Sequence, residues 1–137
     1  SKIASGGEMS RIMLAIKTIL ANVDKMPTMI FDEIDIGISG IAAQKVGEKL
    51  CFISKNHQVI SVTHLAQIAC MADNNYYIEK VTKDGNTETI VKSLNEEDKR
   101  NEIARIIGGA KISDIALKHA EEMLDYAKEF KKAKSNG

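Results

Sequence analysis

The sequence predicts an α/β fold with a mainly parallel sheet flanked by helices. Three observations lead to this class. The chain opens with the apolar spacing of an amphipathic helix, and two short apolar runs at 28–32 and 58–63 have the pattern of strands buried on both faces. A helical segment over about 40–54 lies between the two runs. Helices that alternate with buried strands are typical of a parallel sheet, because each crossover places a helix on a face of the sheet.

The first predicted element is a helix over about 8–22. Its apolar residues recur at the i, i+3, i+4 spacing of one buried face: Met9, Ile12, Met13, Ile16, Ile19 and Leu20. Gly6 and Gly7 open it, although each glycine disfavours a helix by about 0.8–1 kcal/mol relative to alanine. One interpretation is a capping box between Ser5 and Glu8. The sharper one is a phosphate site, because bare N–H groups at the positive end of the helix dipole can meet a polyphosphate directly.

The first strand ends in Asp32 and Glu33. An ionised carboxylate beside an apolar core must be solvated, paired or bound to a cation. Open α/β sheets place their ligands at the carboxyl ends of parallel strands, where Mg²⁺ is a natural partner for one of these acids. The other acid points differently and can orient or deprotonate a water. The second strand is followed by His64, which we expect at the same sheet edge, either as a functional group or as a hydrogen-bonded bystander.

The rest of the chain predicts a short helix over about 65–72, an antiparallel hairpin at the sheet edge, and helices over about 96–107 and 113–131. An apolar stripe on the last helix is predicted to be a docking surface for the rest of the head: Ile115, Ala116, Ala120, Met123, Leu124 and Ala127. Cys51 and Cys70 lack the spacing of a metal or redox pair, so we expect reduced core thiols.

These motifs follow the type, order and spacing of the signature helix, Walker B strand and switch histidine of the ATP-binding cassette ATPases, which the chain resembles. Glu8 after the glycines, with Ile34 and Asp35 after the acids, is similar to their chromosome-maintenance (SMC-like) branch. The resemblance covers nearly the whole chain. Its segments are ASGGEMSRIMLAIKTIL, PTMIFDEIDIGISGIAAQKVGEKL, QVISVTHLAQIACMAD, EIARIIGG and ALKHAEEML. It implies the C-terminal lobe of a P-loop NTPase head from a bacterial DNA repair member of that branch.

The resemblance also implies roles for individual residues, with ATP and Mg²⁺ as cofactors. Asp32 would hold Mg²⁺ through water, Glu33 would be the general base for the attacking water, and His64 would contact the γ-phosphate. The residues implied to complete the ATP site of the opposite subunit in a homodimer of heads are Ser5, Gly6, Gly7 and Glu8, and those implied for the D-loop are Gly37 and Ser39. Ser39 replaces the usual D-loop aspartate, so a carboxylate contact across the dimer does not carry over.

The chain contains no G-x-x-x-x-G-K-S/T motif, so the resemblance implies a missing N-terminal head half and a coiled coil in the parent protein, and a fragment inactive alone. We expect a lobe over 1–94 and a helical segment over 95–137 that packs on the head. Nineteen basic and nineteen acidic residues leave no net charge, so DNA contact is expected through the full-length protein. The sequence shows neither a membrane-length apolar run nor a leader, which predicts a cytoplasmic, nucleoid-associated protein without membrane contact.

Two other classes of function stay open at this point. A transporter's nucleotide-binding lobe is disfavoured by Glu8, Ile34 and Asp35, because the resemblance would then call for glutamine and a Pro–Thr pair at these places. A non-catalytic interaction domain of similar topology is disfavoured by the joint occurrence of Asp32, Glu33 and His64.

Overall fold

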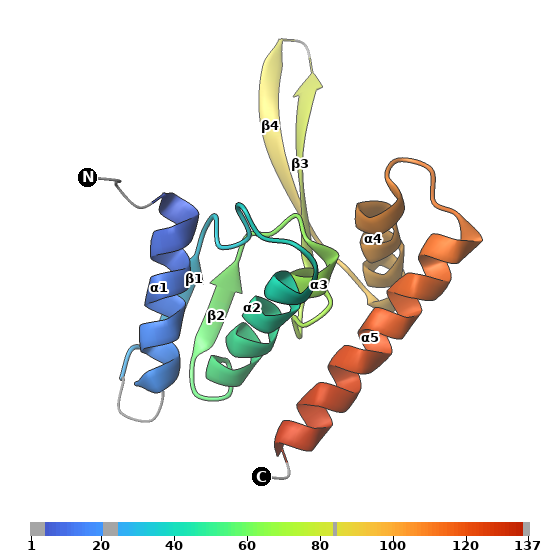
Figure 1. Ribbon diagram of the computed structural model, residues 1–137. Helices are drawn as coiled ribbons and strands as arrows, with labels where there is room; N and C mark the ends of the chain where they lie inside the picture. The colour runs from blue at the N-terminus through green and yellow to red at the C-terminus, as the bar shows by residue number, and fades with distance from the viewer. Residues whose placement is uncertain (1–4, 21–24, 84, 136–137) are drawn as a thin grey trace.

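The computed structural model describes residues 5–20, 25–83 and 85–135. Its elements, in chain order, are α1 (Gly6–Ile19), β1 (Thr28–Phe31), α2 (Gly40–Ile53), β2 (Gln58–Ser61), α3 (Ala66–Ala69), β3 (Tyr76–Lys83), β4 (Asn86–Ser93), α4 (Glu96–Gly108) and α5 (Asp114–Ser135) (Figure 1). The predicted α/β class and the predicted order of elements are confirmed. The end predicted for the first helix, at residue 22, lies outside the described residues.

The parallel sheet consists of β1 and β2, paired from Thr28 with Gln58 to Phe31 with Ser61. Helices α1 and α2 cover one of its faces, and the core between them contains Leu14, Met29, Phe31, Ile34, Leu50, Ile53 and Ile68. The buried face predicted for α1 is wrong, because the side of the helix that packs on this core carries Gly7 and Leu14. The residues predicted to be buried are all exposed: Met9, Ile12, Met13, Ile16, Ile19 and Leu20. The opposite face is open, since Ile30 is 70% exposed and Ile60 is 46% exposed. The prediction of strands buried on both faces is therefore wrong for this chain, because helices cover the two-stranded sheet from one side only.

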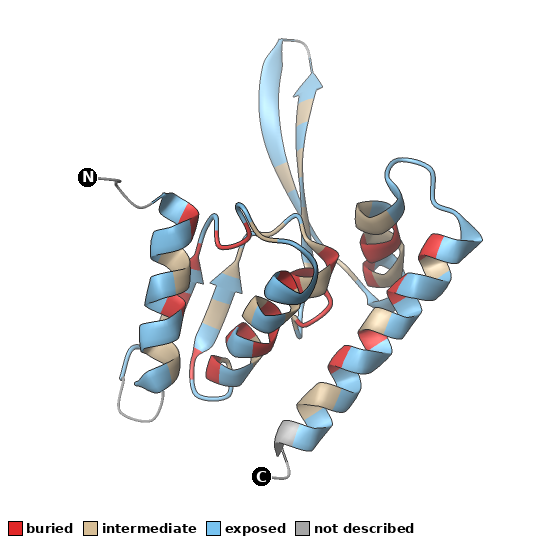
Figure 2. Ribbon diagram, in the orientation of Figure 1, coloured by how far each residue is buried: buried red, intermediate tan, exposed pale blue. Residues whose placement is uncertain are grey.

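The predicted hairpin is present as β3 and β4, which pair from Tyr76 with Ser93 to Lys83 with Asn86. Its predicted place at the edge of the parallel sheet is wrong, because the two strands form a two-stranded sheet of their own. Among the described residues, neither strand of the hairpin forms a hydrogen-bonded pair with β1 or β2. The hairpin extends away from the helices and is mostly exposed (Figures 1 and 2).

A second core lies between α3, α4 and α5. It is built largely from small side chains, and its buried residues are Ala66, Ala69, Cys70, Met71, Ile103, Ala104, Ala116, Ala120, Leu124 and Ala127. Most of the predicted stripe on α5 therefore docks on helices of this same chain, whereas Ile115 is 83% exposed. A hydrogen bond of 2.7 Å from the Tyr126 hydroxyl to Glu48 Oε1 joins α5 to α2. The boundary between residues 94 and 95 stays a prediction.

Both cysteines are free thiols, as predicted. Cys70 is buried in the second core, and burial raises its pKa to about 11. The Cys51 side chain is half-buried and packs against the same core. A thiol with a raised pKa stays protonated at neutral pH and is a poor nucleophile, so a packing role is the one that fits.

Candidate functional site

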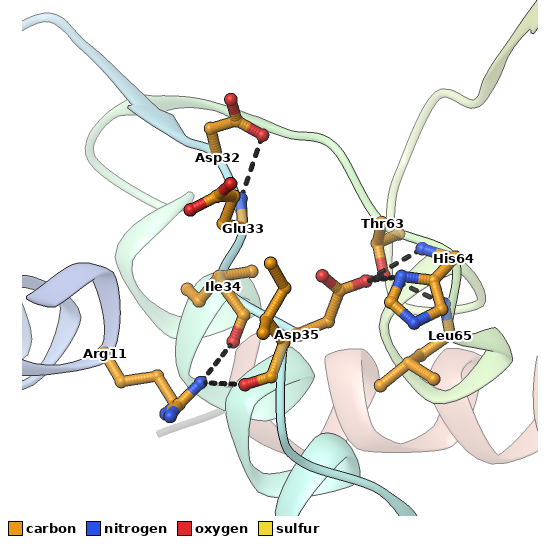
Figure 3. A network of polar contacts seen from close by, with 9 residues as sticks. Arg11, Asp32, Glu33, Ile34, Asp35, Thr63, His64 and Leu65 are labelled. Carbon is orange, nitrogen blue, oxygen red and sulfur yellow. Dashed lines mark hydrogen bonds and ion pairs between the residues drawn. The ribbon is translucent and has the colours of Figure 1, made fainter. Parts of the chain in front are cut away.

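Three segments that are distant in the sequence meet at one edge of the parallel sheet. They are the first turns of α1, the loop that follows β1 and the residues that follow β2. The Ser10 hydroxyl donates to the carbonyl oxygen of Asp32 at 2.8 Å. Arg11 Nη1 donates to the carbonyl oxygens of Ile34 at 3.2 Å and Ile36 at 2.7 Å (Figure 3). The start of α1 is thereby attached along the whole loop that carries the two acids.

The N-terminus of α1 contains the predicted capping box. Ser5 Oγ accepts a hydrogen bond from the Glu8 N–H at 3.3 Å, and the Ser5 N–H donates to Glu8 Oε2 at 2.9 Å. Gly6 is exposed, but Gly7 is buried, and a Cβ on Gly7 would lie only 2.8 Å from the carbonyl oxygen of Glu33. Packing within the chain therefore requires glycine at position 7. The role of both glycines toward a ligand stays a prediction.

Glu33 has the left-handed backbone conformation, with φ of 57°, and it is the non-glycine residue with positive φ among those described. Such a conformation costs on the order of 1–3 kcal/mol and occurs preferentially at functional sites. It directs the carboxylate to the start of α1, where a Cβ on Gly6 would overlap Glu33 Oε2. The positive end of the helix dipole favours a carboxylate at this place.

Asp32 is exposed, and its Oδ1 accepts a hydrogen bond of 2.9 Å from the Glu33 N–H. The two neighbouring carboxylates point in different directions, as the sequence predicted (Figure 3). Among the described residues, no group of three or more His, Cys, Asp or Glu side chains is placed to hold a metal ion. A cation at this edge would therefore depend on oxygen atoms from other sources as well as Asp32.

His64 lies at the same edge, but its carboxylate partner is Asp35 rather than either predicted acid. His64 Nδ1 lies 3.0 Å from Asp35 Oδ2, and the His64 side chain is 72% exposed. The same oxygen accepts hydrogen bonds from the Thr63 hydroxyl at 2.7 Å and from the His64 N–H at 2.8 Å (Figure 3). In the sequence, Asp35 served only to distinguish the SMC-like branch of the ATP-binding cassette ATPases from the transporters. The available signal was a third carboxylate, close behind the first two.

Asp35 is a buried carboxylate whose electrostatic balance is set by these contacts. Only 3% of the residue is exposed, and this burial on its own raises the pKa of the carboxyl group. The bonds from Thr63 and the His64 N–H, together with the charge of His64, outweigh burial and lower the pKa below its usual value. Asp35 therefore stays ionised at neutral pH.

The two predicted D-loop residues, Gly37 and Ser39, are both exposed in the segment that leads to α2. Gly37 has φ of 76°, a conformation that glycine adopts at little cost. Ser39 occupies the N-cap position of α2, but its side chain makes no capping hydrogen bond. Their contact with a ligand stays a prediction. None of the described helices is long and apolar enough to cross a membrane.

The fold defines a partial P-loop NTPase lobe of the kind found in SMC ATPase heads. A solved structure from work on "ATP-driven dimerization and DNA stimulated activation of SMC ATPases" aligns with a TM-score of 0.55 and 25% sequence identity. The alignment covers 79% of this chain and 65% of that one. No family model matches the sequence.

The particular protein that the chain resembles is the DNA repair protein RecN. The chain is 47% identical to RecN of Bacillus subtilis over 131 residues, and 46% identical to that of Haemophilus influenzae over 125 residues. RecN of Rickettsia bellii is 49% identical over 124 residues. The Bacillus match covers 96% of this chain, which spans only 23% of that relative. The resemblance predicted from the motifs is confirmed.

Proposed function

We propose that this chain is the C-terminal lobe of an ATP-hydrolysing, SMC-like head that acts in DNA double-strand break repair and recombination. The observation that carries the proposal is the meeting of α1, the acids after β1 and His64 at one sheet edge. The similar proteins support it, because several are RecN DNA repair proteins and one is described as an SMC ATPase. On this proposal the full-length protein works in the cytoplasm at the nucleoid.

The chemistry of the acids fits a nucleotide bound with Mg²⁺. Magnesium in phosphate sites is held by one or two carboxylates together with waters and substrate phosphates, so a single exposed carboxylate can contribute to such a site. Asp32 is exposed and would hold the ion, which when bound neutralises charge on the phosphate oxygens. Glu33 would orient the attacking water and accept its proton.

The exposed start of α1 supports a shared ATP site between two heads. Ser5, Gly6 and Glu8 are all exposed. Ser5 caps the Glu8 N–H, and the remaining N–H groups of a helix start attract phosphate. We place this surface against the ATP of a second head. The buried Gly7 would let the helix start pack closely on the loop after β1, and Gly37 and Ser39 would lie at the boundary between the two heads. Binding energy available only in the closed state would then make ATP join the heads, and hydrolysis would release them.

The open face of the parallel sheet supports contact with the rest of the head. Ile30, Ile60 and Val62 expose apolar side chains on the parallel sheet, and α1 adds Met9, Ile12, Met13 and Ile16. The two sets lie on different surfaces, because α1 covers the opposite face of the sheet, and large exposed apolar surfaces mark interaction sites. The similar RecN proteins are far longer than this chain, which spans 23% of one of them. We propose that the N-terminal head half, joined through the coiled coil, covers this face and supplies the phosphate loop.

The test is Glu33→Gln in the full-length protein. We expect ATP hydrolysis to slow by about 10²–10⁴ because the general base is lost, while ATP binding is retained. The matched control is Glu88→Gln, the same chemical change at an exposed position on β4 of the hairpin, which should hydrolyse ATP at the wild-type rate. Wild-type turnover in Glu33→Gln would remove Glu33 from the proposed role.

A further inference from the structure

We propose that Asp35 is a positioning residue that holds the His64 imidazole in the orientation needed for its phosphate contact. The inference rests on the proposed function and deepens it. The observation behind it is the convergence of three donors on one oxygen, Asp35 Oδ2. They are the Thr63 hydroxyl at 2.7 Å, the His64 N–H at 2.8 Å and His64 Nδ1 at 3.0 Å.

The contact fixes both the backbone and the side chain of His64. A carboxylate that holds a residue's N–H and its imidazole at once leaves the ring little rotational freedom. Thr63 adds to the rigidity, because its hydroxyl oxygen also accepts a hydrogen bond from the Leu65 N–H at 3.1 Å. Hydrogen bonds to an ionised group are about twice as strong as neutral ones, so this arrangement is well determined.

The contact also determines which ring nitrogen faces outward. A carboxylate only accepts hydrogen bonds, so His64 Nδ1 must carry a hydrogen and Nε2 is the nitrogen directed away from Asp35. The imidazole is 72% exposed, which leaves Nε2 accessible to a ligand. A phosphate oxygen accepts as well, so the ring that can bind one is the doubly protonated form, whose charge Asp35 balances.

The two residues come from different elements. Asp35 follows β1 and His64 follows β2, and the parallel register of Phe31 with Ser61 brings these two loops side by side. The segment that contains Asp35 is also attached to α1 through Arg11, which donates to the carbonyl oxygens of Ile34 and Ile36. Asp35 therefore ties the histidine to the same loop that carries Asp32 and Glu33.

The test is a double-mutant cycle for ATP hydrolysis in the full-length protein, with His64→Gln, Asp35→Ala and the two combined. We expect Asp35→Ala to lower kcat by roughly ten- to hundredfold, because a misplaced contact loses most of its effect on rate. The combined variant should be no slower than His64→Gln alone, since Asp35 acts only through that side chain. Asp35→Asn, which keeps an acceptor without the charge, should recover part of the lost rate.

If Asp35 only stabilised the loop after β1, the variants would show a different pattern of ATP hydrolysis rates. In that case the effects of Asp35→Ala and His64→Gln multiply in the combined variant, and Thr63→Val, which removes another donor to Asp35, slows hydrolysis as much as Asp35→Ala does. Either result overturns the inference. Should Asp35→Ala fail to fold, Asp35→Asn takes its place in the cycle. Wild-type turnover in His64→Gln would instead refute the role proposed for His64 itself, so the two failures are distinguishable.

Discussion

The two halves of this chain use their apolar residues in different ways. In the region from α1 to β2, one sheet face and much of α1 remain exposed, although Leu14, Phe31 and Ile53 form a buried core. In the region from α3 to α5, small side chains close a core within the chain. Figure 2 shows buried residues on both α4 and α5. The site residues belong to the first region and to the short segment that follows β2, which includes His64. We propose that the first region serves contact and chemistry and that the second supplies stability.

The local strain follows the same division. The first region holds Glu33 in the left-handed conformation, buries the Asp35 carboxylate and packs Gly7 against the Glu33 carbonyl. The second region contains ordinary helix features, such as the Asn95 side chain that caps α4 by accepting from the Asp98 N–H at 2.8 Å. It also buries a charged side chain, Lys99, whose Nζ donates to the Ala72 carbonyl oxygen at 2.8 Å. Changes in the first region should therefore alter turnover more than stability, and changes in the second should do the reverse.

The largest effect is expected from Ser5→Arg. In the full-length protein this change should abolish ATP hydrolysis without unfolding the head, because a long cation at the exposed start of α1 blocks the partner's nucleotide. ATP hydrolysis and thermal unfolding measured on the same preparation test it. The control is Ser5→Ala, which removes the cap at a cost of about 0.5–2 kcal/mol but leaves room for the nucleotide. Normal ATP-dependent dimerisation of Ser5→Arg would contradict the role given to this surface.

The opposite pattern is expected for Leu124→Ala in the second core. Leu124 is buried against α3 and α4, and replacing such a leucine by alanine costs about 2–5 kcal/mol through lost burial and the cavity that remains. Urea unfolding of the full-length protein should show this loss, with turnover per folded molecule unchanged at low temperature. Ile115→Ala on the same helix, at a side chain that is 83% exposed, should change stability by less than about 0.5 kcal/mol. A large loss of turnover in Leu124→Ala would contradict the claim that changes in the second region affect stability rather than turnover.

A smaller effect is expected from the pH dependence of Asp35. Burial raises the pKa of this carboxyl group, but the bonds from Thr63 and His64 lower the pKa by a larger amount, so that it lies below the usual 3.8. The folded state then binds fewer protons than the unfolded state, so the stabilisation is complete above the usual value and is lost as pH falls through the lowered one. Asp35→Asn should therefore unfold at a lower temperature than wild type near neutral pH, with the difference shrinking below about pH 4. A difference independent of pH would show that the charge is not what stabilises the fold.

The features that sequence could predict were local ones. The presence of helices α1 and α2 and the capping box of Ser5 and Glu8 depend on residues a few positions apart, and the structure confirms them. The buried face predicted for α1 was wrong, because the apolar residues assigned to it are exposed and Leu14 is buried instead. Residues distant in the sequence decide the rest. Ile30 is exposed because no element of the described chain covers that face, and His64 meets Asp35 across 29 positions because of the register of β1 and β2. Neither fact is present in the local pattern.

The central claim is that one chain's α1 start and its own Glu33 serve different ATP molecules in a dimer of heads. Mixing full-length Ser5→Arg protein with Glu33→Gln protein before adding ATP tests it directly. With equal amounts and random pairing, half of the dimers are mixed, and each of these has one site that combines an intact Ser5 with an intact Glu33 and one site that lacks both. Hydrolysis should then rise to about a quarter of the wild-type rate. Because Glu33 lies beside Gly6 within a single chain, the competing arrangement uses both on the same nucleotide, and then mixing restores nothing.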